Sequence, residues 1–280
     1  MDGLYSPKVV RELLDQFGLA PLKKFGQNFL CDGNVVRKIA ETGLPEEGGN
    51  VLEIGPGLGA LTDALSRRAK KVVAVEIDEG MVRVLSHTLA DRENVTVVHA
   101  DFLKVDLPKL ISEQFGDEDY YVCGNLPYYI TGPIIMEILK QERLPKRLTA
   151  MVQKEVAERI SARPGDDDYS GFSAQMAYFG ETELCFTVPG TSFLPKPDVE
   201  SAVISLELTP KFGSAFADYD RVVKGLFAMR RKTILNNLRK SFALSSDAAQ
   251  AILSKAGFAP SMRAEELSPA DFDLLARLMK

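Results

Sequence analysis

The sequence contains few of the residues that build metal centres and disulfide frameworks. Its 280 residues include only three cysteines and two histidines, and Cys31, Cys123 and Cys185 lie far apart with no C-x-x-C spacing. We therefore expect no bound metal and no disulfide framework. No apolar run approaches the roughly 18 residues that would cross a bilayer, and the N-terminal segment has a polar, helical pattern unlike that of a secretory signal. These absences predict a cytoplasmic protein without a membrane partner.

The net charge of −5 argues against a nucleic-acid partner, but the charge is unevenly distributed. The stretch from residue 221 to residue 240 contains seven cations and no acidic residue, which indicates a surface that faces phosphate groups. A solvated helix face is the alternative, although such faces usually mix both signs. The seven cations are Arg221, Lys224, Arg230, Arg231, Lys232, Arg239 and Lys240.

The chain is long enough for two domains, because single hydrophobic cores seldom grow beyond about 250 residues. After two N-terminal helices, the second capped by Asp32, short apolar runs alternate with helical patterns, as in a doubly wound parallel sheet. The expected strands are 51–54, 71–77, 95–99, 120–123 and 148–153. Two later runs, within 183–190 and 201–208, suit an antiparallel pair at the sheet edge. We predict an α/β domain over residues 1–208 and a small all-helical domain over residues 209–280.

A glycine-rich loop follows the first expected strand in the segment VLEIGPGLGALT. Gly55 and Gly57 permit a tight turn and the close approach of a ligand to the positive end of the following helix. The loop also satisfies the pattern G-x-G-x-x-A, a permitted dinucleotide fingerprint. By itself, it does not distinguish NAD from another nucleoside cofactor.

Polar groups end the next three strands, at the sheet edge where open α/β sheets bind ligands. Glu76 can accept hydrogen bonds from both hydroxyls of a ribose, and Asp101 can meet the exocyclic amino group of an adenine. Asn125 ends the fourth strand and cannot titrate. A dehydrogenase needs a proton donor or acceptor beside the hydride, so this asparagine disfavours the NAD alternative.

Seven motifs of the chain together resemble the ribosomal RNA adenine dimethyltransferase family. They are GQNFL (26–30), LEIGPGLGALT (52–62), VEID (75–78), ADFL (100–103), GNLPYYIT (124–131), FLPKPDVESAV (193–203) and RRKTILNNL (230–238). The resemblance covers nearly the whole chain and is strongest to enzymes that dimethylate two adjacent adenosines near the 3′ end of 16S rRNA. It implies a Rossmann-like class I methyltransferase domain over 1–208, S-adenosylmethionine as cofactor, and a helical RNA-binding domain over 209–280.

The resemblance also implies roles for individual residues. Phosphate contacts are expected from Lys23, Lys24 and the cations of the 221–240 stretch. Cofactor contacts are implied for Asn28, Leu30, Gly55, Gly57, Glu76, Asp101 and Asn125. The target adenine is expected to be held by Asn125, Leu126, Pro127 and Tyr128. Stacking of the base, rather than the resemblance, makes Phe193 the candidate for its other face, with core packing under the loop as the alternative.

Physical chemistry agrees with this assignment at the fourth strand end. The side-chain oxygen of Asn125 and the carbonyl of Leu126 are two acceptors for the hydrogens of an amino nitrogen, and Pro127 stiffens the backbone between them and Tyr128. Tyr128 offers a ring face to a base, whereas Tyr129 is expected to pack in the core.

Two other readings stay open at this point. One is a methyltransferase of the drug-resistance type that acts on large-subunit rRNA, and the other is a ribosome-assembly factor whose main role is binding. The basic RRKTILNNL segment and the long helical tail favour the small ribosomal subunit or its precursor as partner. We expect a monomer.

Overall fold

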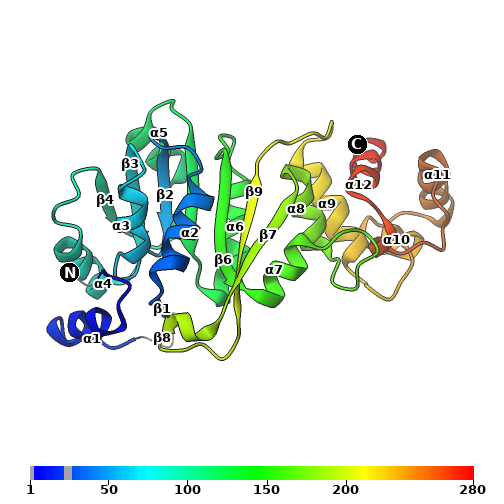
Figure 1. Cartoon of the computed structure of the whole chain (residues 1–280). Coiled ribbons are helices and arrows are strands. Elements are labelled where there is room, and N and C mark those ends of the chain that lie inside the picture. The colour runs from blue at the N-terminus through cyan, green and yellow to red at the C-terminus, as the bar shows by residue number, and fades with distance from the viewer. Residues whose placement is uncertain (1–2, 22–26) are drawn as a thin grey trace. The chain divides into compact units, whose positions relative to one another are not determined.

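A mixed seven-stranded sheet forms the centre of the structure, a computed structural model that describes residues 3–21 and 27–280 (Figure 1). The strand order is β4-β3-β2-β5-β6-β9-β7; the first five strands are parallel and β9 runs antiparallel to β6. Every residue of β2 is buried, as is usual for a strand covered on both faces. The strands are β2 (Asn50–Ile54), β3 (Lys71–Glu76), β4 (Val95–His99), β5 (Tyr120–Asn125), β6 (Arg147–Gln153), β7 (Thr182–Val188) and β9 (Ser201–Glu207).

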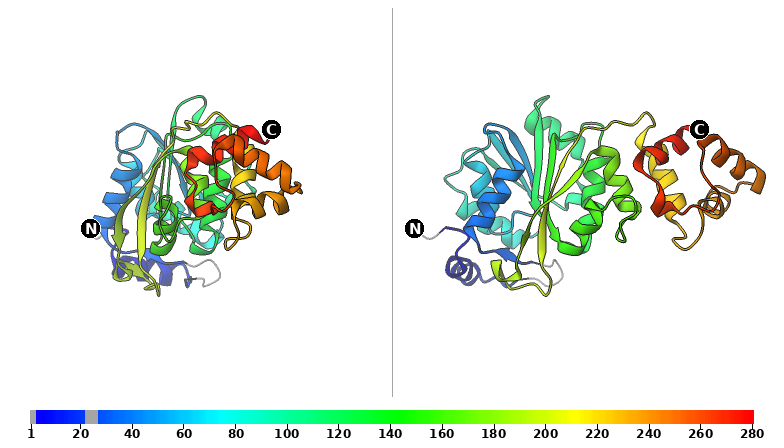
Figure 2. Two further views of the ribbon diagram at one scale, coloured as in Figure 1. Left: turned by 90° about the vertical axis from the view of Figure 1, so that its right-hand side faces the viewer. Right: turned by 45° about the vertical axis from the view of Figure 1, so that its right-hand side comes forward.

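Helices cover both faces of this sheet, as the turned views in Figure 2 show. The helices up to residue 161 are α1 (Pro7–Gln16), which packs against Leu58 and Met81 rather than on a sheet face, α2 (Gly33–Gly43), α3 (Ala60–Ser66), α4 (Glu79–Thr88), α5 (Leu107–Phe115), α6 (Thr131–Leu139) and α7 (Lys154–Ser161). The 3₁₀ turns are η2 (Phe102–Lys104), η3 (Tyr128–Ile130) and η4 (Gly190–Ser192). The predicted cap at Asp32 is confirmed, because its carboxylate accepts the backbone N–H groups of Asn34 and Val35. The helix after the glycine loop begins at Ala60. The residue before it, Gly59, has a left-handed backbone at φ +91° and therefore cannot belong to the helix.

A second, two-stranded sheet joins two loops that are far apart in the sequence. Strand β1 (Phe29–Leu30) pairs antiparallel with β8 (Phe193–Leu194), so that Leu30 lies opposite Phe193. The N–H of Cys31 extends the pairing to the carbonyl of Ser192 at 2.6 Å. The segments GQNFL and FLPKP are thereby held together.

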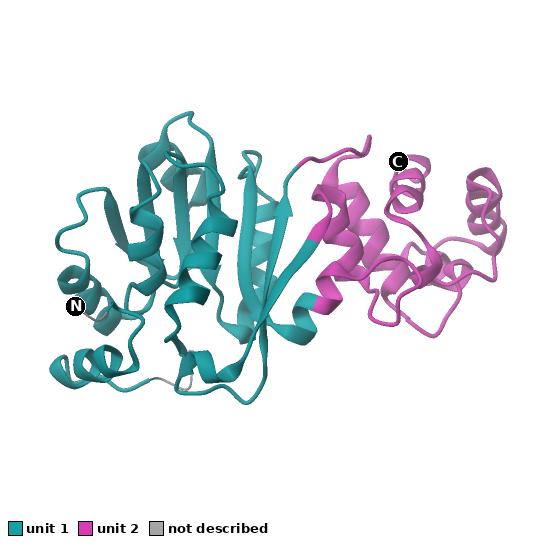
Figure 3. Ribbon diagram, viewed as in Figure 1, with its two compact units in different colours: residues 1–157, 183–208 teal, residues 158–182, 209–280 magenta. Residues whose placement is uncertain are grey.

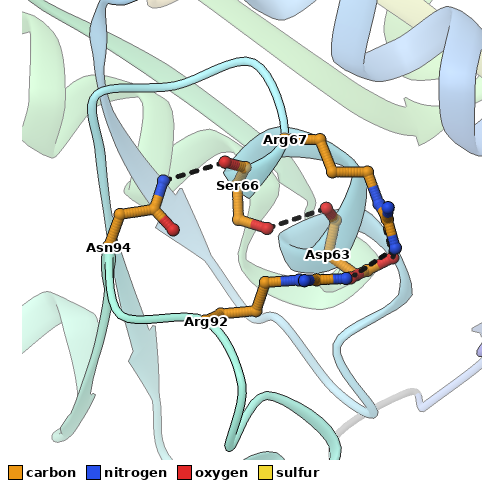
Figure 4. Close-up of polar contacts among 5 residues, drawn as sticks. All are labelled: Asp63, Ser66, Arg67, Arg92 and Asn94. Atoms are coloured by element: carbon orange, nitrogen blue, oxygen red, sulfur yellow. Dashed lines mark hydrogen bonds and ion pairs between the residues drawn. The ribbon is translucent and has the colours of Figure 1, made fainter.

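A polar cluster fixes the C-terminal end of α3 to the loop that precedes β4 (Figure 4). Asp63 binds Arg67 at 3.1 Å and Arg92 at 2.6 Å, so one carboxylate joins the helix to the loop. The amide of Asn94 donates to the carbonyl of Ser66, one of the groups that a helix end leaves without an intrahelical partner. The helix that starts at the glycine loop is therefore anchored at its far end.

The chain divides into two compact units, the first of residues 1–157 and 183–208 and the second of residues 158–182 and 209–280 (Figure 3). The helices of the second unit are α8 (Gly171–Phe179), α9 (Phe216–Phe227), α10 (Ile234–Ser241), α11 (Ser246–Ala256) and α12 (Pro269–Leu278), with the 3₁₀ turn η5 (Ala264–Glu266). An aromatic core holds them together, including Tyr178 against Tyr219 and Tyr219 against Phe272.

This unit differs in extent from the division predicted from the sequence. Residue 208 ends a segment of the first unit, but residues 158–182 group with the C-terminal helices. One physical reason is the tyrosine of α9: the hydroxyl of Tyr219 donates to the carbonyl of Ala174 in α8 at 2.8 Å. The assignment of roles to two domains stays a prediction.

The sheet agrees closely with the expected strands. All five parallel strands lie where the apolar runs predicted them, within two residues at each end, and β9 and β7 close the edge. Within the described parts of the chain, no helix is both long and apolar enough to cross a membrane.

Candidate functional site

A pocket opens at the carboxyl ends of β2, β3, β4 and β5, the edge where the sequence placed its polar groups. Three carboxylic acids line it, namely Glu53, Glu76 and Asp101, and the described lining residues include no lysine or arginine. The cofactor contacts implied by the sequence are brought together, because Asn28, Leu30, Gly55, Gly57 and Asn125 line the same pocket.

The glycine loop forms one wall of the pocket in a conformation that only glycine adopts readily. Gly55 and Gly57 have φ values of +67° and +58°, in the left-handed region where a β-carbon is disfavoured. The nearest atom to a β-carbon built on Gly55 would be the backbone oxygen of Asn125, at 3.8 Å. The loop therefore leaves room for a ligand against its backbone.

Glu76 is held by the backbone of the loops beside it. Its carboxylate is buried, and it accepts the N–H of Gly57 at 3.2 Å and the N–H of Asp78 at 2.9 Å. Burial raises the pKa of Glu76, while these two backbone hydrogen bonds oppose that rise. These two hydrogen bonds, one to each carboxylate oxygen, fix the orientation of the side chain.

Glu53 is a pocket residue that the sequence analysis did not select. Its side chain is only 1% exposed, and its Oε2 has no hydrogen-bond partner. Burial raises the pKa of Glu53 from 4.5 to about 8. The sequence did contain a signal for this residue, because Glu53 is a carboxylate inside the apolar strand VLEI. A buried charge is costly unless it has a partner or a ligand, so such a position indicates a binding site.

Asn125 begins a loop that is fixed by contacts to several elements. Its Nδ2 donates to the carbonyl of Asn28 at 3.3 Å. The side-chain oxygen of Asn125 therefore points away from Asn28. The N–H of Leu126 donates to the carbonyl of Met151 in β6 at 3.1 Å. Thr131, whose side chain is buried, donates its hydroxyl to the carbonyl of Pro127 at 3.1 Å. The two predicted acceptors therefore sit on a backbone with little freedom to move.

The three aromatic residues that the sequence analysis considered lie in different environments. Tyr128 lines the pocket and is half-buried. The expectation for Tyr129 was wrong, because this side chain is 55% exposed and lines the pocket. Phe193 is not among the lining residues; its side chain is 5% exposed and packs in a core cluster with Leu30 and Val36. Pairing of β8 with β1 directs this ring into the core.

All seven cations of the 221–240 stretch are exposed, but they fall into two groups. Arg221 and Lys224 form ion pairs with Asp218 and Asp220, two acids that precede the stretch. The other five cations have no ion pair with any described residue, and we call them the unpaired cations. They are Arg230, Arg231, Lys232, Arg239 and Lys240. Lys23 and Lys24 lie outside the described residues.

A buried asparagine shapes the turn that carries three of the unpaired cations. Asn237 has no exposed side-chain surface; it accepts the N–H of Met229 at 3.1 Å and donates to the carbonyl of Lys232 at 3.4 Å. Its side chain replaces the backbone partners that this turn lacks. The motif RRKTILNNL thus contains both three exposed cations and Asn237, the residue whose hydrogen bonds stabilise the turn that carries them.

Comparisons with known proteins give one consistent result. The family model described as "Ribosomal RNA adenine dimethylase" matches residues 21–280. The chain is 42% identical to "Ribosomal RNA small subunit methyltransferase A" of Geobacillus sp. (strain WCH70), over 98% of this chain and 97% of that protein. It is 43% identical to the protein of the same name in Geobacillus thermodenitrificans, over 98% and 96% of the two chains.

Two solved structures support the same fold. A dimethyladenosine transferase from Plasmodium falciparum superposes with a TM-score of 0.76 at 26% identity, covering 88% of this chain and 95% of that one. The 23S rRNA methyltransferase ErmE superposes with a TM-score of 0.69 at 30% identity, covering 90% and 100%.

Together, the fold and the site define a class I S-adenosylmethionine-dependent methyltransferase. The chain belongs to the ribosomal RNA adenine dimethylase family, and its activity is that of an rRNA adenine dimethyltransferase.

The pocket suits the cofactor of this class better than a dinucleotide. S-adenosylmethionine carries a sulfonium and an amino group, both cationic, and one carboxylate. Glu53, Glu76 and Asp101 line the pocket and offer acceptor oxygens to the cationic groups. The pyrophosphate of NAD is anionic and would find no lysine or arginine among the described lining residues. The unpartnered Oε2 of Glu53 is an acceptor that a cationic group can satisfy.

The raised pKa of Glu53 predicts a pH dependence of stability. Between pH 4.5 and about 8 the folded chain holds the Glu53 proton that the unfolded chain releases, so stability falls as the pH rises through this window. Glu53→Gln mimics the neutral acid. Without ligand, this variant should match the wild type at pH 5 and exceed its free energy of unfolding at pH 8, by on the order of a few kcal/mol. Urea denaturation measures the difference.

The control is Glu142→Gln, which alters an exposed carboxylate. Its stability relative to wild type should not change between pH 5 and pH 8. A Glu53→Gln variant that shows the same gap at both values would contradict the assignment of a buried neutral acid.

Proposed function

We propose that this chain transfers methyl groups from S-adenosylmethionine to N6 of two adjacent adenosines near the 3′ end of 16S rRNA, giving N6,N6-dimethyladenosines during biogenesis of the small ribosomal subunit. One observation carries the proposal: Asn125 and Tyr128 line the same pocket as Glu76 and Asp101. A group that binds an amino nitrogen is therefore next to groups that suit an adenosine-containing cofactor.

The small subunit is favoured by the curated relatives. Proteins named for the small subunit align at 42–43% identity over at least 96% of their own length. The large-subunit enzyme ErmE is similar at 30% identity, which makes a large-subunit substrate the second candidate.

Residues at the carboxyl edge of the sheet would bind the cofactor. When bound, S-adenosylmethionine supplies a methyl group that is activated by its attachment to a sulfonium. Glu76 would accept the ribose hydroxyls, and Asp101 would accept from the adenine amino group. The backbone of Gly55 and Gly57 would lie against the cofactor, with Asn28, Leu30 and Asn125 completing the contacts.

Asn125 and Leu126 would prepare the adenine amino group for methylation. The N6 lone pair of adenine is delocalised into the ring, so the nitrogen is a poor nucleophile while it stays planar. Acceptance of its two hydrogens by the side-chain oxygen of Asn125 and the carbonyl of Leu126 favours a pyramidal nitrogen. The product amine loses its proton to water, so the site requires no strong base. Alignment of the reacting groups can supply up to about 7–11 kcal/mol.

The target base must leave its stack to reach this site, at a cost of a few kcal/mol. Stacking on an aromatic ring returns about 1–3 kcal/mol per base. Tyr128 would provide one face. Phe193 stays the prediction for the other face, and it would have to leave its buried cluster to act. Tyr129 already presents a ring at the pocket.

The remaining parts of the proposal concern the partner and the cellular setting. The unpaired cations would bind rRNA phosphates, together with Lys23 and Lys24. We further propose a monomer that acts in the cytoplasm without a membrane partner. A mainly non-catalytic assembly factor is the alternative in another class, and the two roles can coexist.

The substrate can be tested directly with labelled S-adenosylmethionine. Small and large ribosomal subunits that lack the modification are separated, incubated with the enzyme, and digested for mass analysis of the nucleosides. We expect label in the small subunit alone, as N6,N6-dimethyladenosine at two adjacent positions. Label confined to the large subunit would establish the second candidate instead.

Asn125→Ala tests the catalytic role. Removal of one acceptor for N6 should lower the methylation rate by about 100- to 1,000-fold, the range measured for loss of one preorganised polar group in other enzymes. Binding to small subunits should change less than about threefold, which filter binding can measure. Asn34→Ala, an exposed asparagine at the start of α2, is the control. Wild-type methylation by the Asn125 variant would refute the assignment.

The unpaired cations predict a salt-dependent affinity. The logarithm of the binding constant should fall with the logarithm of the salt concentration, by roughly 0.7 per phosphate contact on single-stranded RNA. Replacing Arg230, Arg231 and Lys232 with glutamine should lower the slope by about 2. Lys224→Gln should lower it less, because this lysine is paired with Asp220. A wild-type slope near zero would contradict the proposed RNA contacts.

A further inference from the structure

The hydroxyl of Tyr128 makes a hydrogen bond that reaches across the fold. Its oxygen lies 2.6 Å from the Oγ of Ser201, a residue 73 positions later in the chain. Tyr128 begins the turn η3 beside the pocket, and Ser201 is the first residue of β9. Either oxygen can be the donor. Burial raises the pKa of Tyr128, so the phenol keeps its proton and its hydrogen bond at neutral pH.

Ser201 is a rigid support for this contact. Its side chain is 0% exposed, and its backbone lies opposite Gln153 in the antiparallel pairing of β9 with β6. The preceding residue, Glu200, accepts the N–H of Lys154 at 3.0 Å. The serine hydroxyl is therefore fixed by the sheet and does not follow movements of the pocket loop.

The tyrosine ring is consequently held at both ends. The backbone end is fixed by the loop that Thr131 stabilises through its bond to the carbonyl of Pro127. The hydroxyl end is fixed by Ser201. Stacking needs a defined ring plane, and a ring that is already ordered loses less freedom when a base arrives.

We propose that Ser201 is a positioning residue for adenine methylation, whose hydroxyl orients the ring of Tyr128 against the target base. This inference rests on the proposed function, since it assigns to Tyr128 the base-stacking role. It adds a residue of β9, the second strand from β5 in the sheet, to the machinery of the reaction. Ser201 itself touches neither substrate nor cofactor in this account.

A double-mutant cycle tests the proposal, with methyl transfer to small subunits lacking the modification as the assay. Ser201→Ala and Tyr128→Phe each remove one partner of the same hydrogen bond while the ring is kept. Each should lower kcat about 3- to 10-fold, the equivalent of one net hydrogen bond. The KM for S-adenosylmethionine should stay within twofold. The double variant should be no slower than the slower single variant, because the two changes remove one interaction.

The matched control is Ser205→Ala, which removes a second buried hydroxyl on the same strand, four residues away. Ser205 lies 3.5 Å from the hydroxyl of Thr149 and does not line the pocket. We expect wild-type kcat for this variant. Thermal unfolding is measured for all four variants. A loss of kcat that is equal in the Ser201 and Ser205 variants, with an equal loss of stability, would mean that Ser201 is structural only.

Two other outcomes would overturn the proposal. One is wild-type kcat in both single variants, and the other is a double variant whose loss is the product of the two single losses. Neither outcome would affect the proposed function, which fails separately if the wild-type enzyme does not methylate small subunits. Tyr128→Phe keeps the inference testable if Ser201→Ala does not fold.

Discussion

The close approach of β2 and β5 is the constraint on which the site depends. A β-carbon built on Gly124 would lie 2.7 Å from the carbonyl oxygen of Ile54, a distance that real β-carbons do not show. Glycine at this position lets the two strands end side by side. The cofactor loop that follows Ile54 and the loop that follows Gly124 are then neighbours, with Gly55 close to the backbone of Asn125. A larger residue at position 124 would push the two strand ends apart, and under the proposed function it would separate the methyl donor from the adenine.

The acidic and basic residues of the chain are distributed according to the two ligands that the proposed reaction requires, the cofactor and the RNA. The pocket gathers carboxylic acids and suits a cationic cofactor, whereas the unpaired cations of the second unit suit a polyanion. The net charge of −5 is a sum over the whole chain, so it reveals neither group. The acids Asp218 and Asp220 reduce the basic surface further, by pairing with Arg221 and Lys224.

The sequence predicted the parallel sheet and its ligand edge well, because these depend on local patterns. An apolar run followed by glycine or by a polar residue marks both a strand and its end, and Glu76, Asp101 and Asn125 were found in this way. The burial of a side chain was harder to predict than the secondary-structure element on which it lies. Tyr129 was expected to pack and is exposed, because a short 3₁₀ turn gives no periodic signal that separates a buried from an exposed ring.

Contacts between distant segments that follow no periodic pattern could not be predicted. The pairing of β1 with β8 buries Phe193, and no pattern within FLPKP indicates that partner. The bond between Tyr128 and Ser201 likewise joins residues that only the folded sheet brings together. The same applies to residues 158–182, which lie within the predicted first domain but group with the C-terminal helices.

The doubled tyrosine of GNLPYYIT illustrates how neighbouring residues acquire different tasks. In a 3₁₀ turn, successive side chains point about 120° apart, so two adjacent rings at the same pocket can differ in burial and in contacts. Tyr128 points toward β9 and is fixed by Ser201, while Tyr129 stands 55% exposed at the pocket. An anchored ring suits a base that must be aligned for reaction, and a free ring suits RNA that must enter and leave. Under the proposed function, the turn would therefore assign alignment of the base to Tyr128 and contact with entering RNA to Tyr129.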